Sequence, residues 1–381
     1  MKNKLSQLNE QQKDLLQGFC AALYIFPLSL CVGVLSGIGV FGGTVAGMVG
    51  CLLNAVGGVS FVPCWMLFMP AFFAIKEFGS GFAFAAMLIG AVLFAVLQAI
   101  LRKKKISIQM TDAAVAGLAL GAAFLTTVIL TKDYFGIAAS GNTAIEMLQS
   151  YRSNGFHANW RGVLYGTITL VIMITWPRKF RTFKKYIPAP LMAIVIPLLI
   201  NMLLNYEAYR TPVYETGAYS LQDLNRLFDF AANTHSWWLL PVVGIGFCVC
   251  FMTAFLFNQQ DSTDRSQAIS HLLTSVVCLP LKPYEYSSKS VLGGTVGALT
   301  VLLVSIAFPV ISRIPTHSMA VVLITLGWQS VPWGKIKKSF LGGIKDITAL
   351  LLCFACFVAA DPILAFLPPL VSIFDKKKMS E

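Results

Sequence analysis

The chain has 381 residues, of which 56% are hydrophobic and only 12% are charged. An average soluble protein carries about twice that charged fraction, and a soluble fold of this size could not cover its surface with so few polar side chains. The composition therefore excludes a cytosolic enzyme, a disordered chain and a secreted disulfide scaffold. The chain must lie in a lipid bilayer, where a helical span takes roughly 20 residues and this length holds at most about fourteen spans.

The net charge is +12, from 29 Lys and Arg against 17 Asp and Glu. The basic residues fall in short runs between apolar stretches, which is typical of topology signals beside an anionic membrane leaflet and not of nucleic-acid binding. The nine cysteines lie in apolar segments, and the four histidines are scattered without metal-ligand spacing. We therefore expect no disulfide framework, no metal and no cofactor. The sequence also shows no nucleophile–base pair and no phosphate-binding loop, so we do not expect an enzyme.

Apolar runs separated by polar residues, Gly or Pro predict the membrane spans. The third run is short, and the zone after the eighth run contains only about half a span of clearly apolar sequence. The fifth run follows Thr111 and Asp112, a pair typical of a helix start. In chain order, the predicted spans cover about 15–36, 40–56, 60–75, 82–101, 112–130, 162–176, 187–204, 237–257, 291–311, 319–331, 344–360 and 362–374.

The basic runs predict which loops are cytoplasmic, because Lys and Arg concentrate in the cytoplasmic loops of membrane proteins. The long loops at about 132–160 and 205–236 have no basic run and fit the outside. The first two basic runs fall on the side of the amino terminus when every earlier segment crosses, and the last two should lie there too. The four runs are at 102–105, 178–185, 335–338 and 376–378.

This charge pattern constrains the unclear zone from 261 to 290, which must cross the membrane an even number of times. Two short crossings or one re-entrant excursion would satisfy it, and short or broken segments are where transporters place their binding sites. We expect a multi-pass protein of the inner (plasma) membrane, with residues 1–13 and the tail 375–381 in the cytoplasm.

Three motifs carry a resemblance to a known family. The first opens the first predicted span, where residues 13–30 read KDLLQGFCAALYIFPLSL. The second joins Trp176-Pro-Arg to the run YIPAPLMAIV at 186–195, and the third extends from Ile314-Pro through Gly327-Trp328 to Trp333. With these motifs in this order, the chain from about 13 to 370 resembles the SulP-type sulfate permease family of anion transporters.

The resemblance implies an all-α polytopic fold of about 12–14 segments, built as a seven-plus-seven inverted repeat with two half-helices. It implies a core domain at about 14–101 and 237–311 and a gate domain at about 112–204 and 314–374. The family also has a cytoplasmic carboxy-terminal regulatory domain, which we expect to be absent because the chain ends at Glu381. The facing amino termini of the third and tenth segments would hold the anion through unpaired N–H groups.

The resemblance further implies secondary transport of a small inorganic or organic anion by alternating access. Sulfate, bicarbonate and dicarboxylates are the candidate substrates, sodium or a proton is the candidate co-transported ion, and a homodimer is the candidate assembly. The site would lie between the first, third, eighth and tenth segments. The expected substrate-binding residues are Phe26, Ser29, Ser60, Phe61, Val62, Met252, Thr253, Tyr284, Ser287 and Ser288.

Each of these residues also has a structural interpretation. A Ser or Thr in a helix commonly bonds its own backbone, a Phe packs or faces lipid, and Tyr284 to Ser288 fit a solvated loop. The motifs also depart from the family: Leu28 follows Pro27 where the family has Gln, no carboxylate occurs from 237 to 260, and the tenth segment is shortened. These departures favour an alternative, a transport-inactive relative that acts in binding or assembly. The complete set of spans and the short third segment favour transport.

Overall fold

The computed structural model describes eleven stretches of the chain, and all structural statements below refer to them. The gaps between them include parts of the second and third predicted spans, the zone after the eighth span and the last span. The described stretches are residues 10–35, 43–45, 47–48, 51–52, 68–103, 111–141, 143–180, 186–203, 238–257, 291–306 and 313–359.

Within these stretches the chain is helical, and the helices follow the predicted spans to within a few residues at most ends. Three of them, at Gln12–Leu35, Gly81–Leu101 and Asp112–Phe135, are long and apolar enough to cross a bilayer. The helices are α2 (Glu10–Leu35), α4 (Phe68–Phe78), α5 (Ser80–Lys103), α6 (Asp112–Phe135), α7 (Ala144–Asn154), α8 (Trp160–Lys179), α9 (Ala189–Leu203), α11 (Leu240–Phe257), α13 (Val291–Ile306), α15 (Thr316–Gln329), α16 (Trp333–Leu341) and α17 (Ile344–Ala359).

Two helices lie where the hydropathy pattern predicts only loops. Helix α7 begins after Thr143, whose side chain accepts a hydrogen bond from the backbone N–H of Glu146 at 3.2 Å. This T-x-x-E spacing is a capping-box signature that could have revealed the helix. Helix α16 is short and amphipathic, with Lys335 paired and Ile336 buried against α6. A search for long apolar runs misses both helices because neither spans the membrane.

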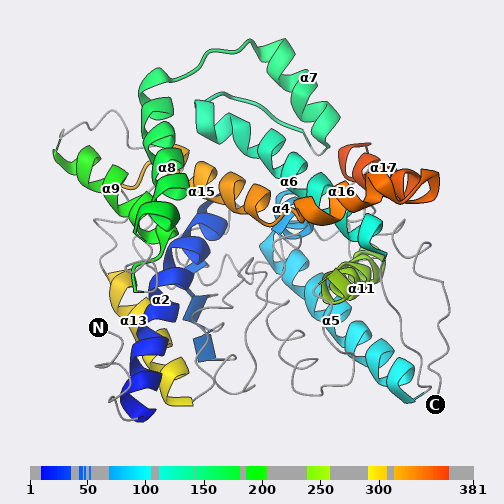
Figure 1. The fold of residues 1–381 in the computed structure, drawn as a ribbon, viewed down its shortest axis with the longest axis horizontal. Coiled ribbons are helices and arrows are strands. Elements are labelled where there is room, and N and C mark those ends of the chain that lie inside the picture. Colours follow the sequence, from blue (N-terminus) through cyan, green and yellow to red (C-terminus); the bar gives the residue numbers. More distant parts are fainter. Residues whose placement is uncertain are drawn as a thin grey trace.

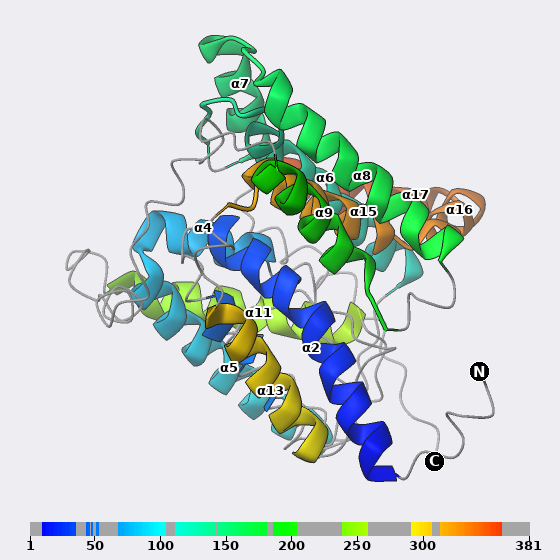
Figure 2. The ribbon, with the colours of Figure 1, turned by 90° about the vertical axis from the view of Figure 1, so that its left-hand side faces the viewer.

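The helices form two groups that appear as separate layers in Figure 2. One group holds α2, α4, α5, α11 and α13, and the other holds α6 to α9 and α15 to α17. The groups meet where α2 contacts α9 and α15 and where α4 contacts α6. We call the end of the molecule at which α2 and α6 begin the proximal end, and the opposite end, where α7 lies, the distal end (Figure 2).

The helix contacts repeat between the two halves of the chain. Helix α2 pairs with α13, and α11 pairs with α5; likewise α6 pairs with α17, and α15 pairs with α8. If α2 and α11 each begin a repeat, the pair of α2 with α13 corresponds to the pair of α11 with α5. In the same way, the pair of α6 with α17 corresponds to the pair of α15 with α8. Helix α2 begins at the proximal end, whereas α11 ends there, so the repeats are inverted. The expected inverted-repeat fold is therefore confirmed in the described residues.

Close helix crossings in the first group depend on glycine. A Cβ atom on Gly90 of α5 would lie 2.8 Å from the carbonyl oxygen of Gly244 on α11. A Cβ atom on Gly18 of α2 would overlap the carbonyl oxygen of Gly293 on α13. Apolar side chains gain little from burial against one another in lipid, so helices in membranes associate through such close backbone approaches. The two crossings are related by the inverted repeat, which explains why both use a pair of glycines.

Helix α11, before the unclear zone, ends on the same side of the molecule on which α13, after the zone, begins. Helix α11 runs parallel to α5, because Gly244 lies beside Ile89 while the rings of Phe251 and Phe94 meet further along both helices. Helix α5 ends proximally, and α13 starts beside Gly18 in the first half of α2 (Figure 1). An even number of crossings between α11 and α13 requires this arrangement, although the zone itself lies outside the described residues.

Candidate functional site

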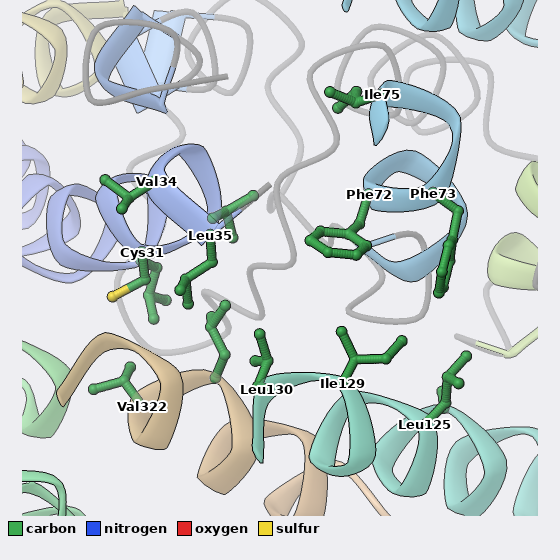
Figure 3. Packing of buried hydrophobic residues seen from close by; sticks show 14 of the residues in the cluster. Cys31, Val34, Leu35, Phe72, Phe73, Ile75, Leu125, Ile129, Leu130 and Val322 are labelled. Atoms are coloured by element: carbon green, nitrogen blue, oxygen red, sulfur yellow. The ribbon is translucent and has the colours of Figure 1, made fainter. Parts of the chain in front are cut away.

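The two groups of helices meet at an apolar interface near the distal ends of α2 and α4. Figure 3 shows side chains from these two helices lying opposite side chains from α6 and α15. All the labelled members are buried, so this part of the interface excludes water. They are Cys31, Val34, Leu35, Phe72, Phe73 and Ile75 on one side and Leu125, Ile129, Leu130 and Val322 on the other.

One polar contact joins the two groups at the distal rim of this interface. The Nζ atom of Lys76, on α4, donates a hydrogen bond to the backbone carbonyl of Gly141 at 3.0 Å. Gly141 belongs to the connection between α6 and α7, so the bond links the first group to the second. Hydropathy could not indicate this contact, because the two residues are 65 positions apart and belong to no recognisable motif.

Ser29 and Phe26 lie on the buried face of α2. The hydroxyl of Ser29 donates a hydrogen bond to the carbonyl oxygen of Phe26 at 3.0 Å, so its single proton is committed to its own helix. The same hydroxyl oxygen lies 2.8 Å from the position that a Cβ atom on Gly47 would occupy. Ser29 therefore packs against the segment that contains Gly43 and Gly47, whose G-x-x-x-G spacing permits close approach. As placed here, its oxygen can accept a hydrogen bond but cannot donate one to an anion.

Met252 lies on the buried face of α11 and belongs to the same apolar cluster as Phe247 and Phe251. Thr253 follows it in the same helix. Leu28, which stands where the resemblance predicts a Gln, is fully buried. The structure thus places Phe26, Ser29 and Met252 in buried parts of α2 and α11, while Ser60, Phe61, Val62, Tyr284, Ser287 and Ser288 lie outside the described residues. In the described stretches, His, Cys, Asp and Glu side chains form no group of three that could hold a metal.

A buried polar pair that the sequence did not single out begins α15. The ring nitrogens of His317 and the hydroxyl of Ser318 are buried, and no hydrogen-bond partner for them lies among the described residues. The His317 ring packs on Gly162, at the start of α8, where a Cβ atom would overlap it. Asn159 closes the junction by capping α8 and by donating its backbone N–H to Phe135 at 2.8 Å. Three helix termini thus meet at the distal end of the second group.

An ion pair and two tryptophans connect the end of α15 and the start of α16 to α6. Lys335 of α16 pairs with Asp112, the first residue of α6, at 2.9 Å. The indole N–H of Trp328 donates to the hydroxyl of Thr127 at 2.8 Å, and its ring stacks on Trp333. The expected capping role is also present, because the side chain of Thr111 accepts from the backbone N–H at the third position of α6.

A family model described as the sulfate permease family matches residues 12–288. This chain belongs to the sulfate permease family. The match includes the first two of the three motifs, and the resemblance to this family is confirmed. Because the family is one of membrane anion transporters, the chain is a multi-pass membrane protein of an anion-transporting family.

Solved structures with the same fold accompany the family match. The transmembrane domain of the cyanobacterial bicarbonate transporter BicA aligns with a TM-score of 0.68 at 17% identity, covering 94% of this chain and 97% of that one. Murine Solute Carrier 26 family member A9, in an inward-facing state, aligns with a TM-score of 0.66 at 11% identity, covering 94% and 66%. At these identities the likeness establishes the fold with its core and gate domains. No curated protein matches the chain.

Proposed function

We propose that this sulfate permease family member carries a small anion across the membrane by alternating access. In this proposal the first group of helices is the core domain, at about 14–101 and 237–311, and the second is the gate domain, at about 112–204 and 314–374. The observation that carries the proposal is the apolar contact of α2 and α4 with α6 and α15 (Figure 3). Such a surface makes no directional bonds, so one group can slide or separate from the other without leaving buried polar groups unpaired.

The anion site belongs to the core in this proposal. Half-helix amino termini at the third and tenth segments would supply N–H groups and partial positive charge, so a buried Lys or Arg is not needed. Because the Ser29 proton is committed to Phe26, the backbone N–H groups near Ser60 and Ser287 become the main expected donors. The proposed set otherwise stays as the sequence predicts it: Phe26, Ser29, Ser60, Phe61, Val62, Met252, Thr253, Tyr284, Ser287 and Ser288.

The substrate belongs to the sulfate, bicarbonate or dicarboxylate class. The family description names sulfate and the BicA structure is described as a bicarbonate transporter, which makes these two anions the first to test. In the proposed orientation, the proximal end faces the cytoplasm of a cell with the protein in its inner (plasma) membrane. Sodium or a proton as co-transported ion and a homodimer as assembly remain proposals that uptake and mass measurements can address.

Uptake into reconstituted vesicles tests the proposal. We expect saturable uptake of labelled sulfate or bicarbonate, measured with and without an imposed sodium or proton gradient, and none in empty vesicles. Ser60→Trp should abolish it by filling the expected site. Gly334→Ala is the matched control, since a Cβ atom there meets nothing within 4 Å. Absence of saturable uptake for every anion tested would overturn the proposal, and unchanged kinetics in Ser60→Trp would move the site elsewhere.

A second candidate function is that of a transport-inactive subunit for binding or assembly. The burial of Leu28 and Met252 and the internal hydrogen bond of Ser29 favour it, because apolar side chains occupy positions where an anion site needs donors. The two candidates differ in a ligand-dependent measurement. A transporter should be stabilised against thermal unfolding by millimolar sulfate or bicarbonate through mass action. An inactive subunit that has lost the site should show neither stabilisation nor uptake.

A further inference from the structure

The proximal end of the second group carries a surface that anion transport does not explain. Helix α16 and the first turn of α17 form an elbow at this end, joined by Gly342 and Gly343 (Figure 1). We call residues 333–345 the α16 elbow. It follows directly on α15, so any force on the elbow acts on the group of helices that we propose as the gate domain.

One face of the α16 elbow is fastened to the protein. Ile336 and Ser339 are buried, and Lys335 forms its ion pair with Asp112 at the start of α6. The stacked rings of Trp328 and Trp333 join the start of α16 to the end of α15. These contacts hold the helix across the beginning of α6, so its opposite face has a defined direction away from the protein.

The α16 elbow also exposes large apolar side chains, including the ring of Trp333, which stacks on Trp328 and is still half-exposed. Trp333 is 53% exposed, Phe340 57%, Leu341 88% and Ile344 81%. An apolar cluster of this kind beside the ends of membrane spans fits the acyl boundary of a bilayer, where amphipathic helices lie in the plane of the interface. Tryptophan at the level of the headgroups is typical of that position, and phenylalanine and leucine are typical of the apolar face of such helices.

The α16 elbow also carries exposed positive charge. Lys337, Lys338 and Lys345 are exposed, whereas the charge of Lys335 is neutralised by Asp112. Asp346 is only half-exposed, and its carboxylate lies against Gly342. Long lysine side chains can lay their stems along apolar surface while the ammonium groups reach the headgroup layer. The elbow therefore combines exposed apolar side chains with three exposed lysines within residues 333–345.

We propose that the α16 elbow is a binding site for the headgroups of anionic phospholipids. Lysines near a negatively charged leaflet each raise membrane affinity by about fivefold, and a zwitterionic headgroup offers no such gain. The ion pair and the tryptophan stack fix the depth of the elbow, so bound lipid holds the proximal end of the proposed gate domain at that leaflet. The inference needs no anion transport, because it rests on the exposed side chains and their charges alone.

Quenching of Trp333 fluorescence tests the proposal with defined lipids. The full chain is reconstituted in phosphatidylcholine vesicles that contain either brominated phosphatidylglycerol or brominated phosphatidylcholine at the same fraction. The Trp333 contribution is the difference between the native chain and Trp333→Phe. We expect quenching of this contribution to be at least about threefold more efficient with the brominated anionic lipid, and we expect high salt to reduce the preference.

Substitutions distinguish lipid binding at the α16 elbow from a general attraction of anionic lipid to the charged surface of the protein. The combined change Lys337→Gln, Lys338→Gln and Lys345→Gln should abolish the preference, whereas Lys179→Gln, which removes an exposed charge at the end of α8, should leave it intact. Equal quenching by both lipids in the native chain would overturn the proposal, as would an equal loss in Lys179→Gln. Absence of quenching by either lipid would also overturn it, since a second protein copy would then cover the elbow. Uptake measured on the same vesicles reports separately on transport.

Discussion

The crossing of α5 and α11 leaves no room for a side chain at Gly90. In Gly90→Ala, the new Cβ atom would lie 2.6 Å from Cβ of Phe247, 2.8 Å from the carbonyl oxygen of Gly244 and 2.9 Å from the backbone nitrogen of Cys248. Two of these three atoms belong to the α11 backbone and the third is a Cβ atom, so no rotamer change can move any of them. The helices must therefore separate until the contacts reach the ordinary range of about 3.5 Å, a shift of nearly 1 Å.

That separation sets the expected cost. A gap of about 0.5–1 Å forfeits a quarter to a half of each contact's well depth of about 0.1–0.2 kcal/mol. If roughly 30 atom pairs line the crossing, the loss is about 1–3 kcal/mol, which agrees with the usual cost of overpacking. Titration of the purified protein with SDS in mixed micelles measures the free energy of unfolding directly, and Gly90→Ala should lower it by this amount.

Gly334→Ala is the control for Gly90→Ala. Gly334→Ala also replaces a helical glycine, but its Cβ atom meets nothing within 4 Å. It should be neutral or stabilising by up to about 1 kcal/mol, because alanine favours helix over glycine. If Gly90→Ala unfolds at the same SDS fraction as Gly334→Ala, the crossing is looser than described, and the argument from glycine contacts fails.

Three further predictions concern the distal end. Lys76→Met removes the hydrogen bond to Gly141 between the two helix groups, worth about 0.5–1.5 kcal/mol. A membrane-impermeant maleimide should therefore label Cys31 about 2- to 12-fold faster in a chain with no other cysteine. An unchanged labelling rate would show that this hydrogen bond does not hold the two groups together. Gly162→Ala should lower the free energy of unfolding by about 1–3 kcal/mol, because the new methyl group overlaps the His317 ring. Adding His317→Ala to this variant should restore much of the loss. If Gly162→Ala costs as much in the His317→Ala chain as in the native chain, the contact between Gly162 and the His317 ring is excluded. Burial raises the pKa of Tyr151 from 10.0 to about 12, so the unfolded chain loses this proton at a lower pH than the folded chain. The free energy of unfolding should therefore fall as pH rises from about 10 to about 12. Tyr151→Phe should reduce this dependence on pH, and an identical dependence would place the hydroxyl in water.

The membrane class, most helices and the family could be predicted from sequence because their signals are local. A span such as α6 is a long apolar run after Thr111, and both features lie within one stretch of chain. The T-x-x-E cap of α7 was also local, but a search for apolar runs passes over a helix that does not span the membrane. Helix α16 was missed because its apolar side chains are few and interrupted by lysines, which the charge pattern assigned to a loop.

The candidate site was less predictable because its residues are chosen by packing. A serine in an apolar helix gives no sign of whether its hydroxyl faces a ligand or its own backbone, and Ser29 bonds to Phe26. The contact of Lys76 with Gly141 joins distant parts of the chain without a motif. Nothing in the sequence distinguishes His317 from the other three histidines, because its contact with Gly162 exists only in the folded structure.

The sequence by itself determined that the chain lies in a bilayer, about where most of its membrane spans lie, and which family it belongs to. Hydropathy, capping and family motifs all act over short stretches, and burial in lipid requires each backbone polar group to be satisfied within its own helix. Only the tertiary structure decided which helices pair across the repeat, where glycines bring them together and which side chains meet between the two groups. Those choices depend on van der Waals fit between distant segments, and no local pattern encodes such a fit.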